Sequence, residues 1–316
     1  MPSIATTAST AARPVAIVTG ATKGIGREVA QGLAAAGYRT AVVGRGQDRT
    51  LATVAEIVRE TGNPDVDPFG VSDLAERAEV RALAASLAAR YPKVELLVNN
   101  AGAYHSERHP TSDGLERTFA LNVLAPFTLT TLLLDRLRAG APSRVVEVAS
   151  AAHRGQHIDF DDLQGTQRYN GFETYGRSKL ELILLTREFA RRLEGTGVVV
   201  NAVHPGFIRS GFGDNNPGGA GFGVKVAKFL FARSLSYGRQ NVMFVATDPA
   251  AGRVTGQYFS RRRVARTSED ADDMVAARRL FEVCRQLAGT PELPEPVSSA
   301  PPSGDRPPGT PRPTPG

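Results

Sequence analysis

Cysteine is almost absent from this chain of 316 residues, because Cys284 is its single cysteine. One thiol can form no disulfide within the chain and leaves no cysteine cluster to bind a metal. A reducing compartment is the simplest setting for such a chain, so we expect a cytoplasmic protein. His153 and His157 are four residues apart, but Gly155 lies between them and they lack the glutamate of an H-E-x-x-H pattern. The sequence therefore predicts no metal site.

Long apolar runs are also missing. No stretch approaches the ~20 apolar residues that a membrane-spanning helix needs, so we expect no membrane partner. Residues 1–13 are mostly small and rich in threonine and alanine, and they lack the basic flank and apolar core of a secretory signal. We predict that they form a flexible leader.

Charge of one sign does not dominate locally, although the formal net charge is +6. The cations are scattered along the chain, apart from the run Arg261, Arg262 and Arg263. No recognised nucleic-acid-binding motif accompanies this charge, so we expect no nucleic-acid partner.

A glycine-rich turn follows the first apolar run. Residues 14–19 have the length of a buried parallel strand, and Gly20, Gly24 and Gly26 come directly after it, before a helical pattern over 27–36. Glycines let phosphates approach the backbone, and a helix N-terminus presents N–H groups to them. Strand, turn and helix therefore predict a cradle for a dinucleotide pyrophosphate, although the spacing G-x-x-x-G-x-G alone is also compatible with a plain glycine turn.

A cation stands where the second strand ends. Residues 39–44 form the predicted strand, and Arg45 follows it. An acidic residue at this place holds the ribose 2′-OH of NAD, whereas an arginine suits the 2′-phosphate of NADP. Lys23 in the glycine turn can add a second positive charge. The sequence thus favours NADP(H) over NAD(H), the alternative being that both cations are merely solvated.

Polar residues follow two later strands. The strand over 94–98 leads to Asn100, Ala101 and Gly102, and the strand over 144–148 leads to Ser150. Because ligands bind at the carboxyl edge of a parallel sheet, the Ser150 hydroxyl is expected over the same edge as Asn100. Asn122 lies within a helical pattern over 115–137, where a buried amide is costly unless it is hydrogen-bonded. If it is buried, it is therefore a candidate functional residue.

Tyr175 and Lys179 lie four residues apart in a helical pattern over 169–193, so they share one helix face. A neighbouring ammonium favours the phenolate and lowers the tyrosine pKa from its ordinary value near ~10. The phenol can then give a proton to a developing alkoxide or take one from an alcohol. An ordinary exposed Tyr/Lys pair is the alternative.

The remaining patterns complete an alternation of strands and helices. Further helices are predicted over 51–61, 72–90 (with Ser72 as N-cap), 238–247 and 268–287, and further strands over 66–71, 197–203 and 254–259. This alternation predicts one Rossmann-type α/β domain over 14–290, with a doubly wound parallel sheet. The Gly/Asn/Pro-rich residues 214–223 are predicted to be a mobile loop near the substrate. Residues 291–316 contain 10 prolines and are predicted to be a disordered tail.

The motifs occur in an order that resembles the short-chain dehydrogenase/reductase family. They are T-G-x-x-x-G-I-G from Thr19, N-N-A-G from Asn99, Ser150, Y-x-x-S-K from Tyr175 and H-P-G from His204. Within the family the chain resembles the retinol-dehydrogenase-like subgroup. That likeness rests on A-H-R at 152–154, I-D-F-D-D-L at 158–163, R-Y-N at 168–170, R-R-L-E-G-T-G-V at 191–198 and the long gap before Tyr175.

The resemblance implies a catalytic tetrad. Tyr175 would donate or accept the proton, and Ser150 would hydrogen-bond the substrate oxygen. Lys179 would lower the Tyr175 pKa and hold the nicotinamide ribose, and Asn122 would anchor a water in a proton relay. The reaction implied is hydride transfer between the nicotinamide and a small-molecule carbonyl or alcohol substrate.

The resemblance also extends the cofactor site to the adenine, its ribose and the nicotinamide. The residues expected to bind the cofactor are Gly20, Thr22, Lys23, Gly24, Ile25, Gly26, Arg45, Asp73, Leu74, Asn100, Ala101, Gly102, Tyr175, Lys179, Pro205, Gly206 and Ile208.

Three expectations concern the protein as a whole. The tyrosine helix often pairs between subunits in this family, so a homodimer or homotetramer is a hypothesis, and the apolar stripe Leu180, Ile183, Leu184 and Phe189 is either core or interface. The hydrophobic N-terminal anchor of membrane-bound retinol dehydrogenases is missing, which argues against a retinoid as natural substrate. The alternative function is a non-catalytic NADP(H)-binding sensor on the same fold.

Overall fold

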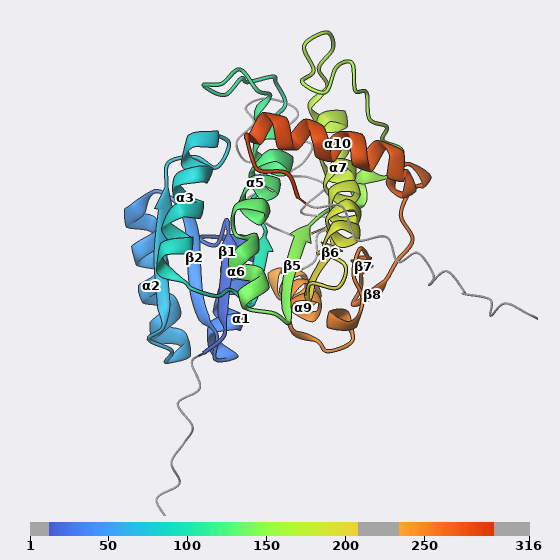
Figure 1. Cartoon of the computed structure of the whole chain (residues 1–316). Helices are drawn as coiled ribbons and strands as arrows, with labels where there is room; N and C mark the ends of the chain where they lie inside the picture. The colour runs from blue at the N-terminus through green and yellow to red at the C-terminus, as the bar shows by residue number, and fades with distance from the viewer. Residues whose placement is uncertain (1–12, 208–233, 294–316) are drawn as a thin grey trace, which may run out of the picture.

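Strand β1 (Val15–Thr19) is apolar and fully buried, as expected for a strand that helices cover on both faces. The computed structural model describes residues 13–207 and 234–293 (Figure 1). In it β1 pairs with β2 and β4 inside an eight-stranded sheet. The strand order is β3 (Val66–Val71), β2 (Arg39–Arg45), β1, β4 (Leu96–Asn99), β5 (Ser143–Val148), β6 (Val198–His204), β7 (Tyr258–Ser260) and β8 (Arg263–Val264). The predicted doubly wound α/β fold is confirmed.

Helices cover both faces of the sheet and enclose one apolar cluster on each. The cluster that includes Leu33 and Val242 lies under α1 (Gly24–Ala35), α2 (Gln47–Thr61) and α9 (Leu235–Thr247). The cluster that includes Leu129 and Ile183 lies under α3 (Arg77–Arg90), α5 (Ala125–Leu132), α6 (Leu134–Ala139) and α7 (Gly171–Arg192). The crevice between β1 and β4, where the winding direction reverses, is the place where ligands bind in such sheets.

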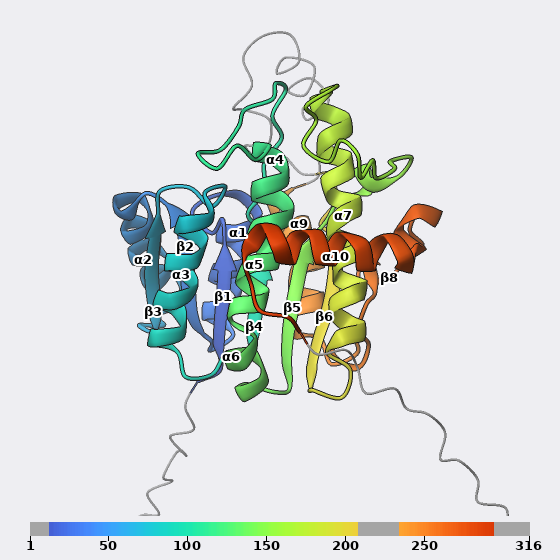
Figure 2. The same ribbon diagram turned by 45° about the horizontal axis from the view of Figure 1, so that its top comes forward.

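Helix α10 (Met274–Ala288) lies across α5 and α7 on the outside of the molecule (Figure 2). Phe281 of α10 packs edge-on against Phe127 of α5 and Phe189 of α7, with ring centroids 4.9 and 5.0 Å apart. The stripe formed by Leu180, Ile183, Leu184 and Phe189 is buried within this single chain. Of the two readings that the sequence allowed, core is the one that the structure shows.

The region before α3 differs from its prediction. Helix α3 begins at Arg77 with Glu76 as its N-cap, so the prediction that Ser72 caps the helix was wrong. Asp73 explains why the helix begins later in the sequence than predicted. Its Oδ1 accepts from the backbone N–H of Ala75 at 2.9 Å and forms a turn that competes with the helix.

The single helix predicted over 115–137 is also wrong, because the chain is divided there. A short helix α4 (Arg117–Phe119) leads into a π-helical turn over Ala120–Leu124, which is followed by α5 and α6. Pro126 has no N–H to donate and stands at the start of α5, directly after the π turn. Such turns often occur at functional sites.

Smaller differences concern where elements begin and end. Helices α1, α2 and α9 begin three or four residues earlier than predicted, at Gly24, Gln47 and Leu235. The strand predicted over 254–259 is reduced to β7, and an antiparallel strand β8 follows it unpredicted. Arg261 and Arg262 make the turn between them with φ of 53° and 60°.

The C-terminal helix, in contrast, begins later than predicted, at Met274. A 3₁₀ turn over Glu269–Asp272 precedes α10, and the Asp273 side chain caps the helix by accepting from the N–H groups of Val275 and Ala276. Among residues 13–207 and 234–293, none of the helices combines the length and apolar character that crossing a bilayer requires. The predicted loop over 214–223 lies outside the described residues.

Candidate active site

The Tyr175–Lys179 pair lies on the first half of α7, where the helix passes the carboxyl ends of the strands. The helix begins at Gly171 because the Asn170 side chain accepts from the N–H groups of Phe172 and Glu173. As predicted from their spacing, the two residues share one face, with Lys179 Nζ 5.7 Å from the centroid of the Tyr175 ring.

Lys179 is buried, with 4% of its surface exposed. Its Nζ donates to the carbonyl oxygen of Val148 at the end of β5, at 2.9 Å. Burial lowers the pKa of Lys179 to about 8, and the charge of Glu147 partly opposes that shift. Lys179 therefore changes its charge close to neutral pH.

Tyr175 does not show the lowered pKa that the sequence predicted. Burial raises the pKa of its hydroxyl to about 12, and a hydrogen bond with Ser150 partly counters this. The Lys179 ammonium donates to the Val148 carbonyl oxygen and lies 5.7 Å from the centroid of the Tyr175 ring, so the burial of the phenol outweighs the effect of that charge. Tyr104 meets the Tyr175 ring edge-on with centroids 6.4 Å apart, which adds to the burial.

Ser150 lies two residues past the end of β5 and caps a 3₁₀ turn over Ala151–His153, where its Oγ accepts from the N–H of Ala152. Two imidazoles hold this turn. His153 Nδ1 lies 2.7 Å from the Ser150 carbonyl oxygen, and His204 Nδ1 accepts from the N–H of Ala151 at 3.3 Å. Burial lowers the pKa of His204 to about 4, so His204 is a neutral acceptor that positions the turn and is not a base at neutral pH.

Asn122 lies in the π-helical turn and is buried. Its side chain exchanges two hydrogen bonds with the backbone of Ala103, both of 2.9 Å, and donates to Ser178 Oγ at 3.0 Å. Gly102 lies beside it, because a Cβ added there would stand 3.2 Å from Asn122 Oδ1 and 3.4 Å from Lys179 Nζ. The structure thus brings Asn122, Ser150, Tyr175 and Lys179 to one edge of the sheet.

The glycine turn is too close-packed for larger residues. A Cβ on Gly26 would lie 2.3 Å from the Gly20 carbonyl oxygen and 2.4 Å from Asn100 Nδ2. Asn100 closes the turn by donating to the carbonyl oxygens of Thr19 and Gly20 at 2.9 and 3.3 Å. No acidic side chain occupies the first turn of α1, so its N-terminal N–H groups suit an anion. This arrangement fits the pyrophosphate of a dinucleotide.

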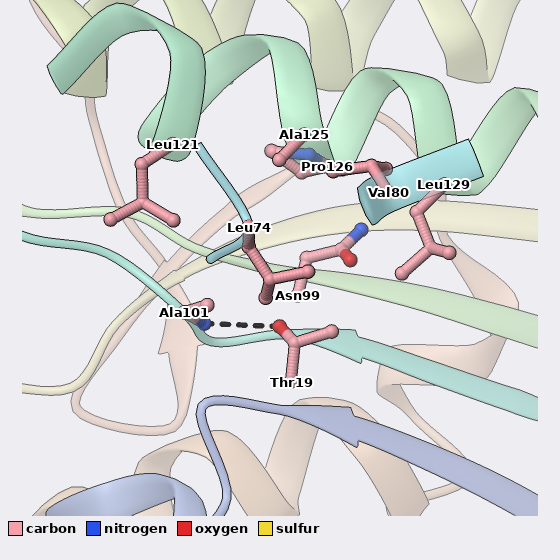
Figure 3. A pocket seen from close by; sticks show the side chains of 9 residues that line it. All are labelled: Thr19, Leu74, Val80, Asn99, Ala101, Leu121, Ala125, Pro126 and Leu129. Carbon is pink, nitrogen blue, oxygen red and sulfur yellow. Dashed lines mark hydrogen bonds between the residues drawn. The ribbon is translucent and has the colours of Figure 1, made fainter. Parts of the chain in front are cut away.

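A small pocket lies between the ends of β1 and β4 and helix α5, at the side expected to take the adenosine (Figure 3). Thr19 Oγ1 accepts there from the N–H of Ala101 at 3.0 Å. The lining residues are Thr19, Leu74, Val80, Asn99, Ala101, Leu121, Ala125, Pro126 and Leu129.

The other residues predicted to bind the cofactor are distributed around this crevice. Asp73 stands close to the pocket residue Leu74 but is ion-paired with Arg117. Thr22 packs against Gly44 at the end of β2, whereas Lys23 and Arg45 are exposed. Partly buried Ile25 lies in the first turn of α1. Pro205 is buried after β6, Gly206 adopts a φ of 103°, and Ile208 lies outside the described residues.

Sequence reasoning missed several polar residues that shape the site. Glu147 and Asn99 lie side by side under α5 and α7, and His153 secures the Ser150 turn. A charged residue at position 147, between the valines at 146 and 148, was the available signal. In the described ranges no group of three or more His, Cys, Asp or Glu side chains is arranged to hold a metal ion.

The short chain dehydrogenase family model matches residues 14–217. The chain belongs to this family. Human retinol dehydrogenase 13 is 36% identical over 284 residues, which cover 86% of this chain and 84% of the relative. The predicted likeness to retinol dehydrogenases is therefore confirmed.

Two solved structures share the fold. A putative uncharacterised protein from Mycobacterium paratuberculosis has a TM-score of 0.72 at 28% identity, covering 90% of this chain and 96% of the other. A Pseudomonas aeruginosa RhlG/NADP active-site complex has a TM-score of 0.61 at 27% identity, covering 83% and 96%. This protein of the short chain dehydrogenase family is an oxidoreductase of the class that acts on CH–OH and C=O groups.

Proposed function

We propose that the protein is an NADP(H)-dependent oxidoreductase that reduces a carbonyl group or oxidises an alcohol through Asn122, Ser150, Tyr175 and Lys179. The observation that carries the proposal is the meeting of these four side chains at the edge of the sheet that also holds the glycine turn. An acid/base constellation beside a dinucleotide cradle is the arrangement that hydride transfer requires.

Each residue of the tetrad has a role that its contacts support. Tyr175 gives its hydroxyl proton to the carbonyl oxygen during reduction and withdraws a proton from the alcohol during oxidation. Ser150, hydrogen-bonded to Tyr175, donates to the same substrate oxygen and stabilises its negative charge. Lys179 in its charged form would hold the nicotinamide ribose, as the family resemblance implies. When bound, the nicotinamide supplies or accepts the hydride.

Asn122 acts through the backbone in this proposal. It ties the segment after β4 to α7, since it bonds Ala103 on one side and Ser178 on the other. Ser178 Oγ in turn donates to the Tyr175 carbonyl oxygen at 2.7 Å. Asn122 thereby fixes the distance between the cofactor edge and the tyrosine helix.

The preference for NADP(H) rests on two exposed cations. Arg45 ends β2, where the adenine ribose is held in dinucleotide-binding sheets, and Lys23 precedes α1. The structural relative from Pseudomonas aeruginosa was solved with NADP, which supports the same preference. Cys284 is a buried free thiol, in keeping with a reducing, cytoplasmic setting.

The predicted homodimer or homotetramer stays a prediction. Helix α10 covers much of the side of α7 that faces away from the sheet, so an interface on that side would have to include α10. Light scattering of the purified protein tests this, and a monomeric mass would contradict it.

The test of the function is oxidation of NADPH and NADH, followed by the nicotinamide absorbance, over a panel of aldehydes, ketones and quinones. Retinal belongs in the panel because the human relative is named a retinol dehydrogenase. Tyr175→Phe should lower turnover by at least about 100-fold and leave NADPH binding intact. Tyr91→Phe is the matched control. It also removes a tyrosine hydroxyl that donates a hydrogen bond, here to Asp67, at a position far from the tetrad. Undiminished turnover in Tyr175→Phe would refute the assignment of the proton donor.

The cofactor preference has its own test. Arg45→Asp should shift the ratio of kcat/KM from NADPH towards NADH by at least about tenfold, because a carboxylate repels the 2′-phosphate and suits the 2′-OH. Arg59→Asp reverses an exposed charge in the last turn of α2 and serves as control. If the ratio stays unchanged in Arg45→Asp, another residue reads the 2′-phosphate.

A further inference from the structure

Glu147 is a carboxylate inside the sheet. It occupies β5 between Val146 and Val148 and is only 3% exposed. Val145, two residues earlier on the same face of the strand, belongs to the apolar cluster under α5 and α7. Glu147 therefore lies beneath the helix that carries Tyr175 and Lys179, in a strand where an apolar residue would pack without cost.

The hydrogen bonds of Glu147 are incomplete. Its Oε1 accepts from Asn99 Nδ2 at 2.8 Å, and the same amide donates to Thr130 Oγ1 of α5 at 3.1 Å. Glu147 Oε2 and Asn99 Oδ1 are buried, and no hydrogen-bond partner is found for them among the described residues. Figure 3 shows the Asn99 side chain between its strand and the helix that carries Ala125 and Leu129. A carboxylate held in this way is costly unless a nearby cation compensates its charge.

Lys179 is that cation. Its ammonium donates to the carbonyl oxygen of Val148, the residue directly after Glu147, and the charges of Lys179 and Glu147 act on each other. In the part of the chain that the structure describes, the other groups beside Glu147 are uncharged: Asn99 on β4, Thr130 on α5 and, in register on β6, Ala202.

We propose that Glu147 is the buried counter-ion of Lys179, whose charge keeps Lys179 protonated so that its ammonium can hold the nicotinamide ribose. The inference rests on the function proposed above and deepens it. Glu147 acts through Lys179 and is therefore a positioning residue rather than a catalytic one.

The protonation equilibria of the pair support this coupling. Burial raises the pKa of Glu147 to about 7, while the Asn99 hydrogen bond and the Lys179 charge oppose the rise. Burial lowers the pKa of Lys179 to about 8, and the Glu147 charge opposes that fall. Each group thus sustains the charged form of the other near neutral pH, and loss of the Glu147 charge lets the pKa of Lys179 fall further.

The test is the pH dependence of NADPH binding in Glu147→Gln, followed by fluorescence titration. The glutamine keeps an oxygen that can accept from Asn99 and removes the charge. The charged form of Lys179 donates to the ribose, so the limb on which NADPH affinity falls with rising pH should move down by about 1 unit. At pH values below both limbs the variant should keep the wild-type affinity to within about twofold, because Lys179 is then charged in both proteins.

Glu181→Gln is the matched control. Glu181 is also a buried glutamate, 1% exposed, two residues from Lys179 on the same helix. The charge that lowers its raised pKa belongs to Arg177 rather than Lys179. The limb should stay in place in this variant. An unmoved limb in Glu147→Gln, or equal shifts in both variants, would overturn the proposal.

Two further measurements keep the proposal testable on their own. If Glu147→Gln does not fold, Glu147→Asp retains the charge, and its limb should move by less than about half a unit; a full-unit shift would contradict the proposal. If the wild type binds no NADPH, or if Tyr175→Phe remains active, the proposed function fails, but the coupling between Glu147 and Lys179 can still be measured.

That measurement is an NMR titration of carbon-13-labelled lysine in the apoprotein. The chain has five lysines, so the spectrum is sparse, and Lys179→Arg assigns the signal of Lys179. The pKa of Lys179 should fall by about 1 unit in Glu147→Gln and stay unchanged in Glu181→Gln. An unchanged Lys179 titration in Glu147→Gln would overturn the counter-ion assignment whatever the enzyme's activity.

Discussion

The acid sensitivity of the fold should depend measurably on His204. This residue ends β6, and its Nδ1 accepts from the N–H of Ala151 in the turn that follows Ser150. Protonation would place a proton on that acceptor and break the bond. His204→Asn offers an amide oxygen at nearly the same place and cannot titrate, so it separates the hydrogen bond from the protonation.

The direction of the change in stability with pH follows from the pKa of His204 in the folded state and in the unfolded state. Burial, assisted by the charges of His153, Arg154 and Arg261, lowers the pKa of folded His204 to about 4. The unfolded chain binds the proton near ~6.5, so between these values the unfolded state holds more protons and stability falls as the pH falls. At one pKa unit per ~1.4 kcal/mol, the contribution lost between about pH 7 and pH 5 is roughly 2 kcal/mol.

The assay is urea unfolding of wild type and His204→Asn at a series of pH values, with the variant subtracted from the wild type. Subtraction is needed because the pKa values of Glu147 and Glu181 are raised to about 7 in the folded protein. These two groups bind protons at a higher pH in the folded state than in the unfolded state, so their contribution to stability changes with pH in the opposite direction. The wild type should lose roughly 2 kcal/mol more than the variant between about pH 7 and pH 5. If the free energies of unfolding of the wild type and of His204→Asn change in parallel with pH, the reasoning is refuted.

Three further predictions follow from close contacts. Gly26→Ala should weaken NADPH binding by at least about tenfold in a fluorescence titration, because the new methyl must displace the Gly20 carbonyl; unchanged affinity would contradict it. Glu188→Ala should cost about 2 kcal/mol in denaturant unfolding, because it removes the buried carboxylate that accepts hydrogen bonds from Arg191 and Arg192, and a loss below about 0.5 kcal/mol would argue against it. Asn170→Ala should cost about 1 kcal/mol through loss of the α7 cap, and the Tm should fall accordingly, whereas an unchanged Tm would show that the cap is not needed.

The architecture could be predicted from the sequence because its signals are local. Apolar runs such as 14–19 and 94–98 mark the inner strands, and the Tyr175–Lys179 spacing fixes a shared helix face. Pro68 stands inside the predicted strand over 66–71, yet the strand forms, because an edge strand tolerates a residue without an N–H.

What the sequence did not reveal depends on contacts between distant segments. The π-helical turn around Asn122 is stabilised by bonds to Ala103 and Ser178, and neither of these can be anticipated from the helical pattern over 115–137. The raised pKa of Tyr175 likewise depends on how deeply the ring is buried and on where the Lys179 ammonium points. Spacing along a helix determines proximity but does not determine the electrostatic environment.

The way in which α10 is attached has a consequence for how the chain folds during synthesis. Arg81 of α3 donates to the carbonyl oxygen of Ala288 at 2.8 Å, across 207 positions of sequence. Arg192 of α7 stacks on Phe281 of α10, with its guanidinium 4.4 Å from the ring centroid. The apolar side of α5 and α7 therefore stays uncovered on the ribosome until nearly the whole chain has emerged. Such late, non-local closure slows folding and exposes nascent chains to aggregation, so the yield in recombinant expression should respond to temperature and to chaperone supply.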